Sequence, residues 1–172
     1  MKRILAIDPG TTESAFVLVG GGCKPIRFDK IENEGLLELM NDGLLNDADH
    51  IVIERVASYG MPVGQEVFAT CEWIGRFTQT ALDWGRPVSF VLRQEEKMTI
   101  CHDSRANDAN IRRALIDRFA RHDMRSGTGT KKNPDFFYGF RRDIWQAYAV
   151  GVTWICRQAE REPKTSAAGQ EG

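Results

Sequence analysis

Short hydrophobic runs that end at glycine, proline or an acidic residue dominate the first half of the chain. Five of them have the length and composition of β-strands: residues 4–7, 14–19, 23–28, 50–54 and 88–92. Runs of four to eight residues bounded by turn residues are typical of strands. Three glycines at 20–22 separate the second run from the third, so we expect a hairpin there.

Apolar residues that recur every three or four positions predict four helices, at residues 34–40, 66–84, 106–120 and 141–157. Between the last two lie residues 124–139, which are rich in glycine, threonine, lysine and asparagine, and we expect a mobile loop there. After residue 160 the chain becomes small and polar, so residues 161–172 are expected to form a disordered C-terminal tail. No repeat or linker divides residues 1–160, which we interpret as a single domain.

Three strands joined by short connections, followed by strands that alternate with helices, predict an α/β fold. Its sheet would be mixed, with three antiparallel strands and then parallel strands, and helices would flank it. The composition agrees with this. A chain of 172 residues with 42% hydrophobic and 27% charged side chains is typical of one globular domain and argues against wholesale disorder or a collagen-like fibre.

The four cysteines lack the C-x-x-C spacing of zinc sites, and we expect them to be buried thiols in a reducing cytoplasm. The N-terminal apolar run, Ile4–Ile7, is too short for a signal peptide or a membrane span. The sequence therefore predicts a cytoplasmic protein with no membrane partner.

The formal net charge of −1 argues at first against a nucleic-acid partner, because phosphate backbones are usually met by a basic surface. The charge is unevenly distributed, however. Residues 1–92 carry 8 Lys+Arg against 13 Asp+Glu, whereas residues 93–142 carry 12 against 7. Near-neutrality is thus an average over an acidic and a basic part, and it does not exclude a polyanionic partner.

Three acidic residues lie where elements begin or end. Asp8 and Glu54 each close a hydrophobic strand, and Asp143 opens the last helix. In an α/β sheet the ends of neighbouring strands converge on one edge, where ligand sites collect. Carboxylates gathered there would repel one another without a cation, and Mg²⁺ or Mn²⁺ prefers such oxygen ligands. A pair of these ions is a known means of phosphodiester cleavage.

Each acid also has a simpler explanation. Asp8 before a Pro-Gly pair suits a turn, Glu54 suits a solvated strand end, and Asp143 suits the favourable dipole of a helix start. These explanations account for each residue alone. They do not explain why two hydrophobic strands both end on an acid.

The motifs that contain these three acids resemble those of a known family. Ile4–Thr12 (ILAIDPGTT) resembles the first motif of RuvC-type Holliday-junction resolvases, which have a ribonuclease H-like fold. Ile51–Glu54 is similar to the family's second acidic strand, and Asp143–Val152 to its last helix, in which an acid heads an alanine-rich apolar run. Lys97 stands where the family has a basic segment before the penultimate helix. The resemblance covers about residues 3–157, with the acidic motifs matching in order and spacing.

The resemblance implies a metal-dependent endonuclease of DNA recombination and repair that cuts branched DNA such as four-way junctions. Asp8, Glu54 and Asp143 would hold two Mg²⁺ or Mn²⁺ ions, and Lys97 would lie near the scissile phosphate. The resemblance also implies a homodimer, with residues 66–84 as the candidate dimer face. A compact resolvase of this kind suits a phage or mobile-element genome, in which case it would act in the cytoplasm of the host cell.

One position departs from the family pattern. The family usually has a second aspartate one helical turn after the first in the last helix, and this chain has Gln146 there. Residues three apart share a helix face, so Gln146 is still expected to point into the site as a weak metal ligand or a partner for water or phosphate. An amide supplies no negative charge, which makes the second metal the weaker one.

Candidate DNA contacts fall into two groups. Basic residues of the segment 93–142 are candidates for phosphate contacts: Arg105, which follows a serine, and Lys131, Lys132, Arg141 and Arg142, which lie next to the predicted loop and ahead of the last helix. In the loop after Glu54, Tyr59 and Met61 are candidates for stacking on bases or wedging between them. An equal alternative is that these two side chains anchor the loop to the helix that follows.

Two other functions stay open on the sequence. A junction-binding protein without catalysis is conceivable because of Gln146. The DPGTT segment at residues 8–12 also resembles the phosphate loop of actin-like ATPases, although that fold needs two such domains and no Walker-type phosphate loop is present.

Overall fold

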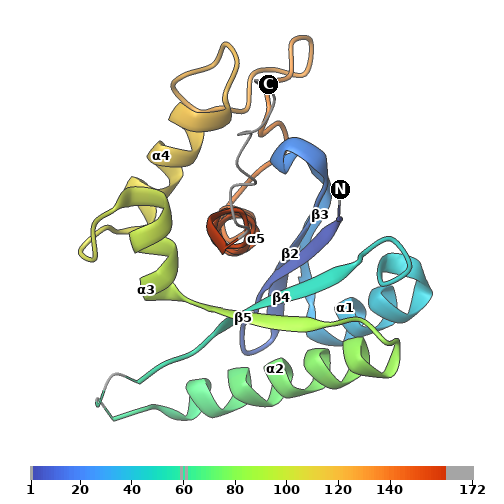
Figure 1. The fold of residues 1–172 in the computed structure, drawn as a ribbon. Helices are drawn as coiled ribbons and strands as arrows, with labels where there is room; N and C mark the ends of the chain where they lie inside the picture. Colours follow the sequence, from blue (N-terminus) through green and yellow to red (C-terminus); the bar gives the residue numbers. More distant parts are fainter. Residues whose placement is uncertain (1, 59, 61, 162–172) are drawn as a thin grey trace, which may run out of the picture.

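The structure is a computed structural model that describes residues 2–58, 60 and 62–161 (Figure 1). Its strands are β1 (Ile4–Asp8), β2 (Glu13–Val19), β3 (Pro25–Glu32), β4 (His50–Arg55) and β5 (Val88–Leu92). Its helices are α1 (Asn33–Leu39), α2 (Gln65–Asp83), α3 (Arg93–Glu96), α4 (Asp108–Phe119) and α5 (Ile144–Arg161). All five strands and all four helices expected from the sequence are present, and α3 is an additional short helix.

The strands form one mixed sheet in the order β3-β2-β1-β4-β5. The pairs β1–β2 and β2–β3 are antiparallel, whereas β1–β4 and β4–β5 are parallel. This confirms the α/β fold with a mixed sheet. The third strand begins at Pro25 rather than residue 23, because Gly21–Cys23 form a 3₁₀ turn with a positive φ at Gly22 and Cys23.

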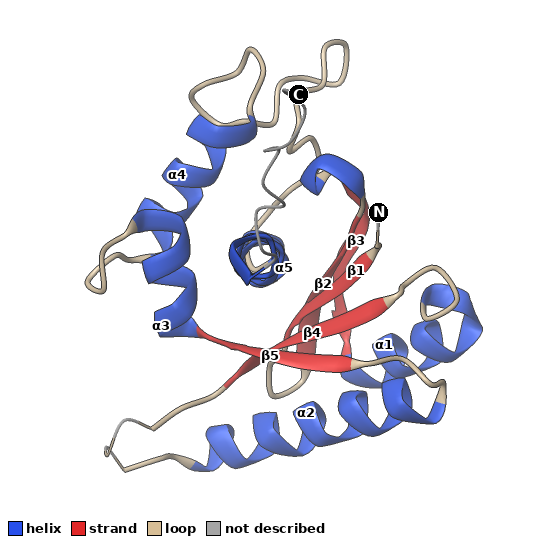
Figure 2. Ribbon diagram, viewed as in Figure 1, coloured by secondary structure: helices blue, strands red, loops and turns tan. Residues whose placement is uncertain are grey.

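Helices cover both faces of the sheet (Figure 2), and the strand residues alternate between two hydrophobic cores. In β1, Ile4 and Ala6 face the core that contains α5, whereas Leu5 and Ile7 face the core that contains α1 and α2. Strands buried on both faces read as continuous apolar runs. This is why Ile4–Ile7 shows no polar alternation in the sequence.

Helix α5 packs unusually close to the sheet at Gly151. A Cβ on this residue would lie 3.0 Å from the Cβ of Ala6 and 3.2 Å from Cγ2 of Val19. Three residues earlier in α5, the buried Tyr148 hydroxyl donates a hydrogen bond of 2.8 Å to the carbonyl oxygen of Cys23. These contacts fix α5 against β1 and β2 and thereby place the segment that precedes it.

Several expectations need correction. The thiols are unpaired, but only Cys23 is buried, while Cys71 is exposed on the outer side of α2 because the core-facing stripe of that helix passes through Thr70, Ile74 and Phe77. Helix α5 continues to Arg161, and the rest of the expected tail, residues 162–172, lies outside the described residues. Among the helices that the structure describes, none combines the length and the apolar character needed to cross a membrane.

Candidate active site

A row of charged side chains crosses the sheet at the end where β1 and β4 finish. The register of the sheet explains which residues the row contains. Lys30 pairs with Ala15, Ala15 with Asp8, and Glu54 with Val91. Asp8 and Glu54 follow the paired residues Ile7 and Ile53 of the parallel strands β1 and β4. Ala15 and Val91 belong to the core that contains α5. Since side chains alternate between faces, Asp8, Glu54 and Lys30 lie on that same face.

Asp8 and Glu54 form the centre of the row. Their carboxyl groups are within hydrogen-bonding reach of each other. Burial, and then the negative charge of Glu54, raise the pKa of Asp8 well above its usual range. Two carboxyl groups that interact in this way are stabilised by a shared proton or by a bound cation.

Asp143 reaches the same place from the segment before α5. Its carbonyl oxygen accepts the first-turn hydrogen bond from the backbone N–H of Ala147 at 3.0 Å, so it stands just ahead of the helix rather than inside it. Its Oδ2 lies 2.6 Å from Nζ of Lys30, which in turn lies 3.7 Å from Oε2 of Glu13. A hollow of about 200 Å³ brings Asp8, Lys30 and Asp143 together with the turn after β1.

A fourth acid, Glu96, is fully buried in α3. Its Oε2 accepts a 2.6 Å hydrogen bond from Arg93, which also forms an ion pair with Asp108. Burial, followed by the charge of Glu54, raises the pKa of Glu96, and the opposing charge of Arg93 does not cancel this effect. Glu96 therefore belongs to the same electrostatic cluster as Asp8 and Glu54.

The donor set fits a hard divalent cation in type but is not arranged as a finished cage. Carboxylate oxygens are the ligands that Mg²⁺ and Mn²⁺ prefer. In the described part of the chain, no three His, Cys, Asp or Glu side chains are placed to hold a metal ion together as they stand. The ion pair between Asp143 and Lys30 accounts for part of this, because it turns one of the carboxylates toward an ammonium group. Gln146 is half-buried in α5 and makes no side-chain hydrogen bond to another described residue.

The basic candidates occupy different surroundings. Arg141 and Arg142 line a second hollow together with Lys30, directly beside the acids. Lys131 and Lys132 are exposed in the segment that leads to them. Four further predicted residues either do not touch the acids in the described contacts or lie outside the described residues. Lys97 is half-buried in the π-helical turn after α3, without an ion pair in the described residues; Arg105 is 93% exposed beside Asp103; Tyr59 and Met61 lie outside the described residues.

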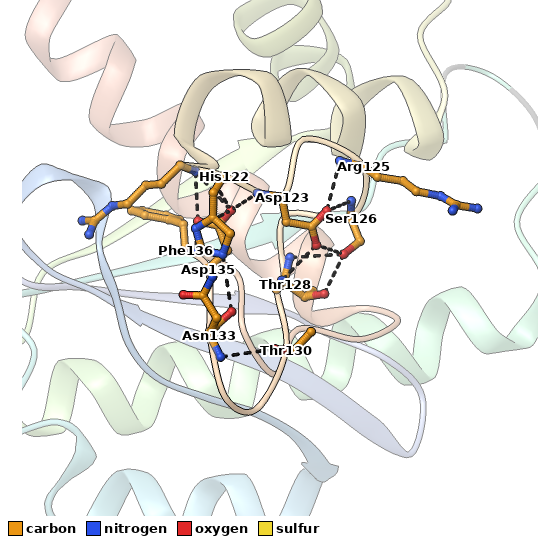
Figure 3. A network of polar contacts seen from close by, with 11 residues as sticks. His122, Asp123, Arg125, Ser126, Thr128, Thr130, Asn133, Asp135 and Phe136 are labelled. Carbon is orange, nitrogen blue, oxygen red and sulfur yellow. Dashed lines mark hydrogen bonds and ion pairs between the residues drawn. The ribbon is translucent and has the colours of Figure 1, made fainter.

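Residues 121–140 are held together by hydrogen bonds to two aspartates (Figure 3), whereas the sequence predicted a mobile loop at residues 124–139. The buried carboxylate of Asp135 accepts hydrogen bonds from four backbone N–H groups, those of residues 121, 122, 123 and 136. Asp123 similarly accepts from the backbone of Ser126 and Gly129. Phe137 and Phe140 are buried in the core beside α5. The composition rich in turn residues was correctly associated with irregular backbone, but it could not reveal these two aspartate anchors.

No protein-family model and no curated protein matches the sequence. Solved structures do match. RuvC of Thermus thermophilus in complex with a Holliday junction substrate aligns with a TM-score of 0.69 and 13% identity, over 94% of this chain and 97% of that one. The fold is that of RuvC. A second structure of Thermus thermophilus RuvC aligns with a TM-score of 0.65 and 14% identity, over 92% and 96% of the two chains.

The RuvC fold also relates the chain to the yeast mitochondrial Holliday junction resolvase Ydc2, with a TM-score of 0.52 and 14% identity over 92% of this chain and 80% of that one. The expected ribonuclease H-like architecture is thus confirmed over nearly the whole chain. Identities this low establish the RuvC fold, while the roles of individual residues depend on the geometry of this chain.

Sequence reasoning missed Lys30, Arg93 and Glu96. Lys30 carries a weak signal, since it lies two residues after Phe28, whose side chain packs on the α5 face. Arg93 and Glu96 lie in a charged stretch of the sequence, RQEEK at residues 93–97, which resembles an ordinary solvated surface. Only the position of α3 beside β5 and α5 reveals that Glu96 is buried.

Proposed function

We propose that this protein is a structure-selective endonuclease that cuts phosphodiesters of branched DNA, with four-way junctions as its substrate. The observation that carries the proposal is the cluster of Asp8, Glu54 and Asp143 at one edge of the sheet, in a chain with the RuvC fold. The similar structures named above include a RuvC bound to a Holliday junction substrate.

Asp8, Glu54 and Asp143 would hold Mg²⁺ or Mn²⁺, two ions in the complete site, with Gln146 as a neutral fourth donor. Bound in this way, such ions supply an activated water and stabilise the charge of the departing oxygen. Glu54 orients Asp8 through their mutual contact, and the fixed start of α5 holds Asp143 opposite them.

Positive charge beside the acids would receive the DNA backbone. Lys30, Arg141 and Arg142 lie around one hollow next to the acidic cluster, and the exposed Lys131 and Lys132 would add further phosphate contacts. Lys97 would add charge near the scissile phosphate. Because these contacts are ionic, binding is expected to weaken steeply with salt.

A second copy of the chain would complete the assembly. A four-way junction is two-fold symmetric, and a homodimer presents two identical sites related by the same symmetry. The side of α2 away from the sheet supports this, because Phe68 and Leu82 are 58% and 52% exposed there. Phe77 lies on the opposite, apolar side of that helix and is buried in the core, so it is not part of this exposed surface.

The decisive experiment is nicking of a synthetic four-way junction in Mg²⁺ or Mn²⁺, compared with a linear duplex of the same sequence. We expect the wild type to nick the junction and Asp8→Asn to lose nicking, by about 10²-fold or more, while still retarding the junction on a gel. Asp42→Asn, at an exposed acid in the turn after α1, is the matched control and should cut normally.

A non-catalytic junction-binding protein is the second candidate function. Two observations favour it, namely the neutral Gln146 and the ion pair that Asp143 forms with Lys30. Junction binding by the wild type without nicking in either metal would replace the nuclease proposal by this one.

A further inference from the structure

Glu96 is the buried charge in this molecule that lacks an adequate explanation. Glu96 is 0% exposed, and its Oε1 has no hydrogen-bond partner in the described structure. Of the buried side-chain polar atoms left without a partner there, it is the only carboxylate oxygen. Leaving a buried charged group partly unsatisfied costs free energy. A buried carboxylate oxygen of this kind is therefore expected to bind a water molecule or an ion.

The topology places Glu96 beside the acidic row. Helix α3 begins at Arg93, directly after β5, and β5 lies next to β4 with Val91 opposite Glu54. Glu96 is one helical turn after Arg93, so the single turn of α3 lies at the end of the sheet where β4 finishes, one residue after Glu54. Helix α3 also packs against α5.

The electrostatics agree with this placement. Apart from burial, the acids that raise the pKa of Asp8 are, in decreasing order of effect, Glu54, Glu96 and Asp143. The charges of Glu96 and Asp143 therefore both act on Asp8. Any divalent cation between Asp8 and Glu54 would lie within the field of Glu96.

The two oxygens of Glu96 are differently engaged. Arg93 donates to Oε2 at 2.6 Å and is itself held by Asp108, whereas Oε1 is free. Ligating carboxylates in metal sites are commonly fixed by a hydrogen bond to the oxygen that does not face the metal. Arg93 is suited to that role, because it orients the side chain and leaves one oxygen for a cation.

We propose that Glu96 is a fourth carboxylate ligand of the metal site, supplying through Oε1 the negative charge that Gln146 does not provide. The proposal rests on the proposed function, since it concerns the same Mg²⁺ or Mn²⁺ site. Under this proposal the fourth acidic ligand lies on the short helix after β5 instead of on the last helix.

The test measures metal binding rather than catalysis. Mn²⁺ is titrated into the full-length protein without DNA, and free Mn²⁺ is measured by electron paramagnetic resonance. Glu96→Gln should weaken the affinity for at least one ion by about tenfold. Glu95→Gln is the matched control, because Glu95 is the adjacent acid of the same helix, bonded to Leu92 and Arg157 instead; its Mn²⁺ binding should equal that of the wild type.

A reciprocal change distinguishes a metal ligand from a structural residue. Gln146→Asp should restore Mn²⁺ affinity in the Glu96→Gln background and add little to the wild type. Equal gains in both backgrounds, or Mn²⁺ binding by Glu96→Gln as tight as that of the wild type, would overturn the proposal. If Glu96→Gln does not fold by circular dichroism, Glu96→Asp keeps the charge but shortens the reach, and the proposal then requires that it bind Mn²⁺ more weakly than the wild type.

The outcomes separate this proposal from the proposed function. A wild type that binds no Mn²⁺ removes both the metal mechanism and the role of Glu96. A wild type that binds Mn²⁺ through Glu96 but does not nick junctions leaves the ligand assignment standing and removes the nuclease.

Discussion

At the scale of single residues, the chemistry depends on how each charge is balanced. Asp8 and Glu54 repel each other, Asp143 is paired with Lys30, and Glu96 is paired with Arg93. The acids are recognisable in the sequence because two of them end hydrophobic strands. Their counter-charges are not, because Lys30 is far from Asp143 along the chain and the neighbouring pair Arg93 and Glu96 resembles an ordinary charged surface.

Lys30 provides a test at this scale. Its ammonium group competes with any cation for Asp143, and such a partly exposed pair is worth ~0.2–1 kcal/mol. Lys30→Met should therefore tighten Mn²⁺ binding by up to about fivefold, while junction nicking falls by about tenfold or more because charge beside the hollow is lost. Lys24→Met, at an exposed lysine, should change neither. Weaker Mn²⁺ binding by Lys30→Met would contradict the competition.

At the scale of elements, two features hold Asp143 in place. One is α5, which packs against the sheet through Gly151, and the other is the segment before it, which Asp135 ties together. The helix was predictable from its period of apolar residues. The start of the helix was predicted three residues too early, at 141 instead of Ile144, because Arg142 has a positive φ and interrupts the helical backbone.

The close approach of α5 predicts the effect of a single methyl group. Gly75→Ala on α2 should stabilise the protein by about 0.5–1 kcal/mol, because a Cβ there meets nothing within 4 Å and alanine favours helix. Gly151→Ala should lose this gain and destabilise the protein, since Ala6 belongs to the central strand and cannot move away. Urea unfolding of both variants checks the prediction, and a stabilised Gly151→Ala would contradict it.

Asp135 predicts a pH dependence of stability. Burial opposes its ionisation, but the backbone N–H groups that bind it prevail and lower its pKa below the usual range. A lowered pKa means that the unfolded chain binds more protons, so this stabilisation is present above about pH 4 and is lost as the pH falls below it.

Asp135→Asn removes that contribution. It should lower the free energy of unfolding by about 1–3 kcal/mol at pH 7 and reduce the further loss of stability between about pH 4 and pH 2. Urea unfolding at several pH values measures both effects, with Asp42→Asn as the exposed control. An acid-dependent loss as steep as that of the wild type would show that other groups cause it.

At the scale of the whole molecule, the opposed charges of the acidic and basic parts acquire a structural meaning. Part of the basic excess is consumed internally, since Arg93 and Arg113 form ion pairs with acids of the same region. The basic side chains beside the acidic cluster are Lys30, Arg141 and Arg142. Near-neutral net charge is therefore compatible with a local site for a polyanion.

The exposed apolar residues of α2 give a prediction for assembly. We expect a dimer in sedimentation equilibrium, and Phe68→Glu should convert it to a monomer because a charge would be buried at the interface. Ile26→Glu, at an equally exposed position on β3 at the opposite edge of the sheet, should remain dimeric. A monomeric wild type would contradict the proposed homodimer.

The sequence alone determined the class of fold and the acids that end its strands, because hydrophobic periodicity and strand endings are local properties of the chain. It also supplied the resemblance whose architecture the structure bears out. Tertiary structure decided which charges meet. Lys30 reaches Asp143, and α3 carries Glu96 to the end of the sheet that holds Glu54, only because register and helix packing join residues that are distant in sequence. Burial of a charge is likewise a property of its neighbours, which is why Glu96 looked like a surface residue until α3 was placed.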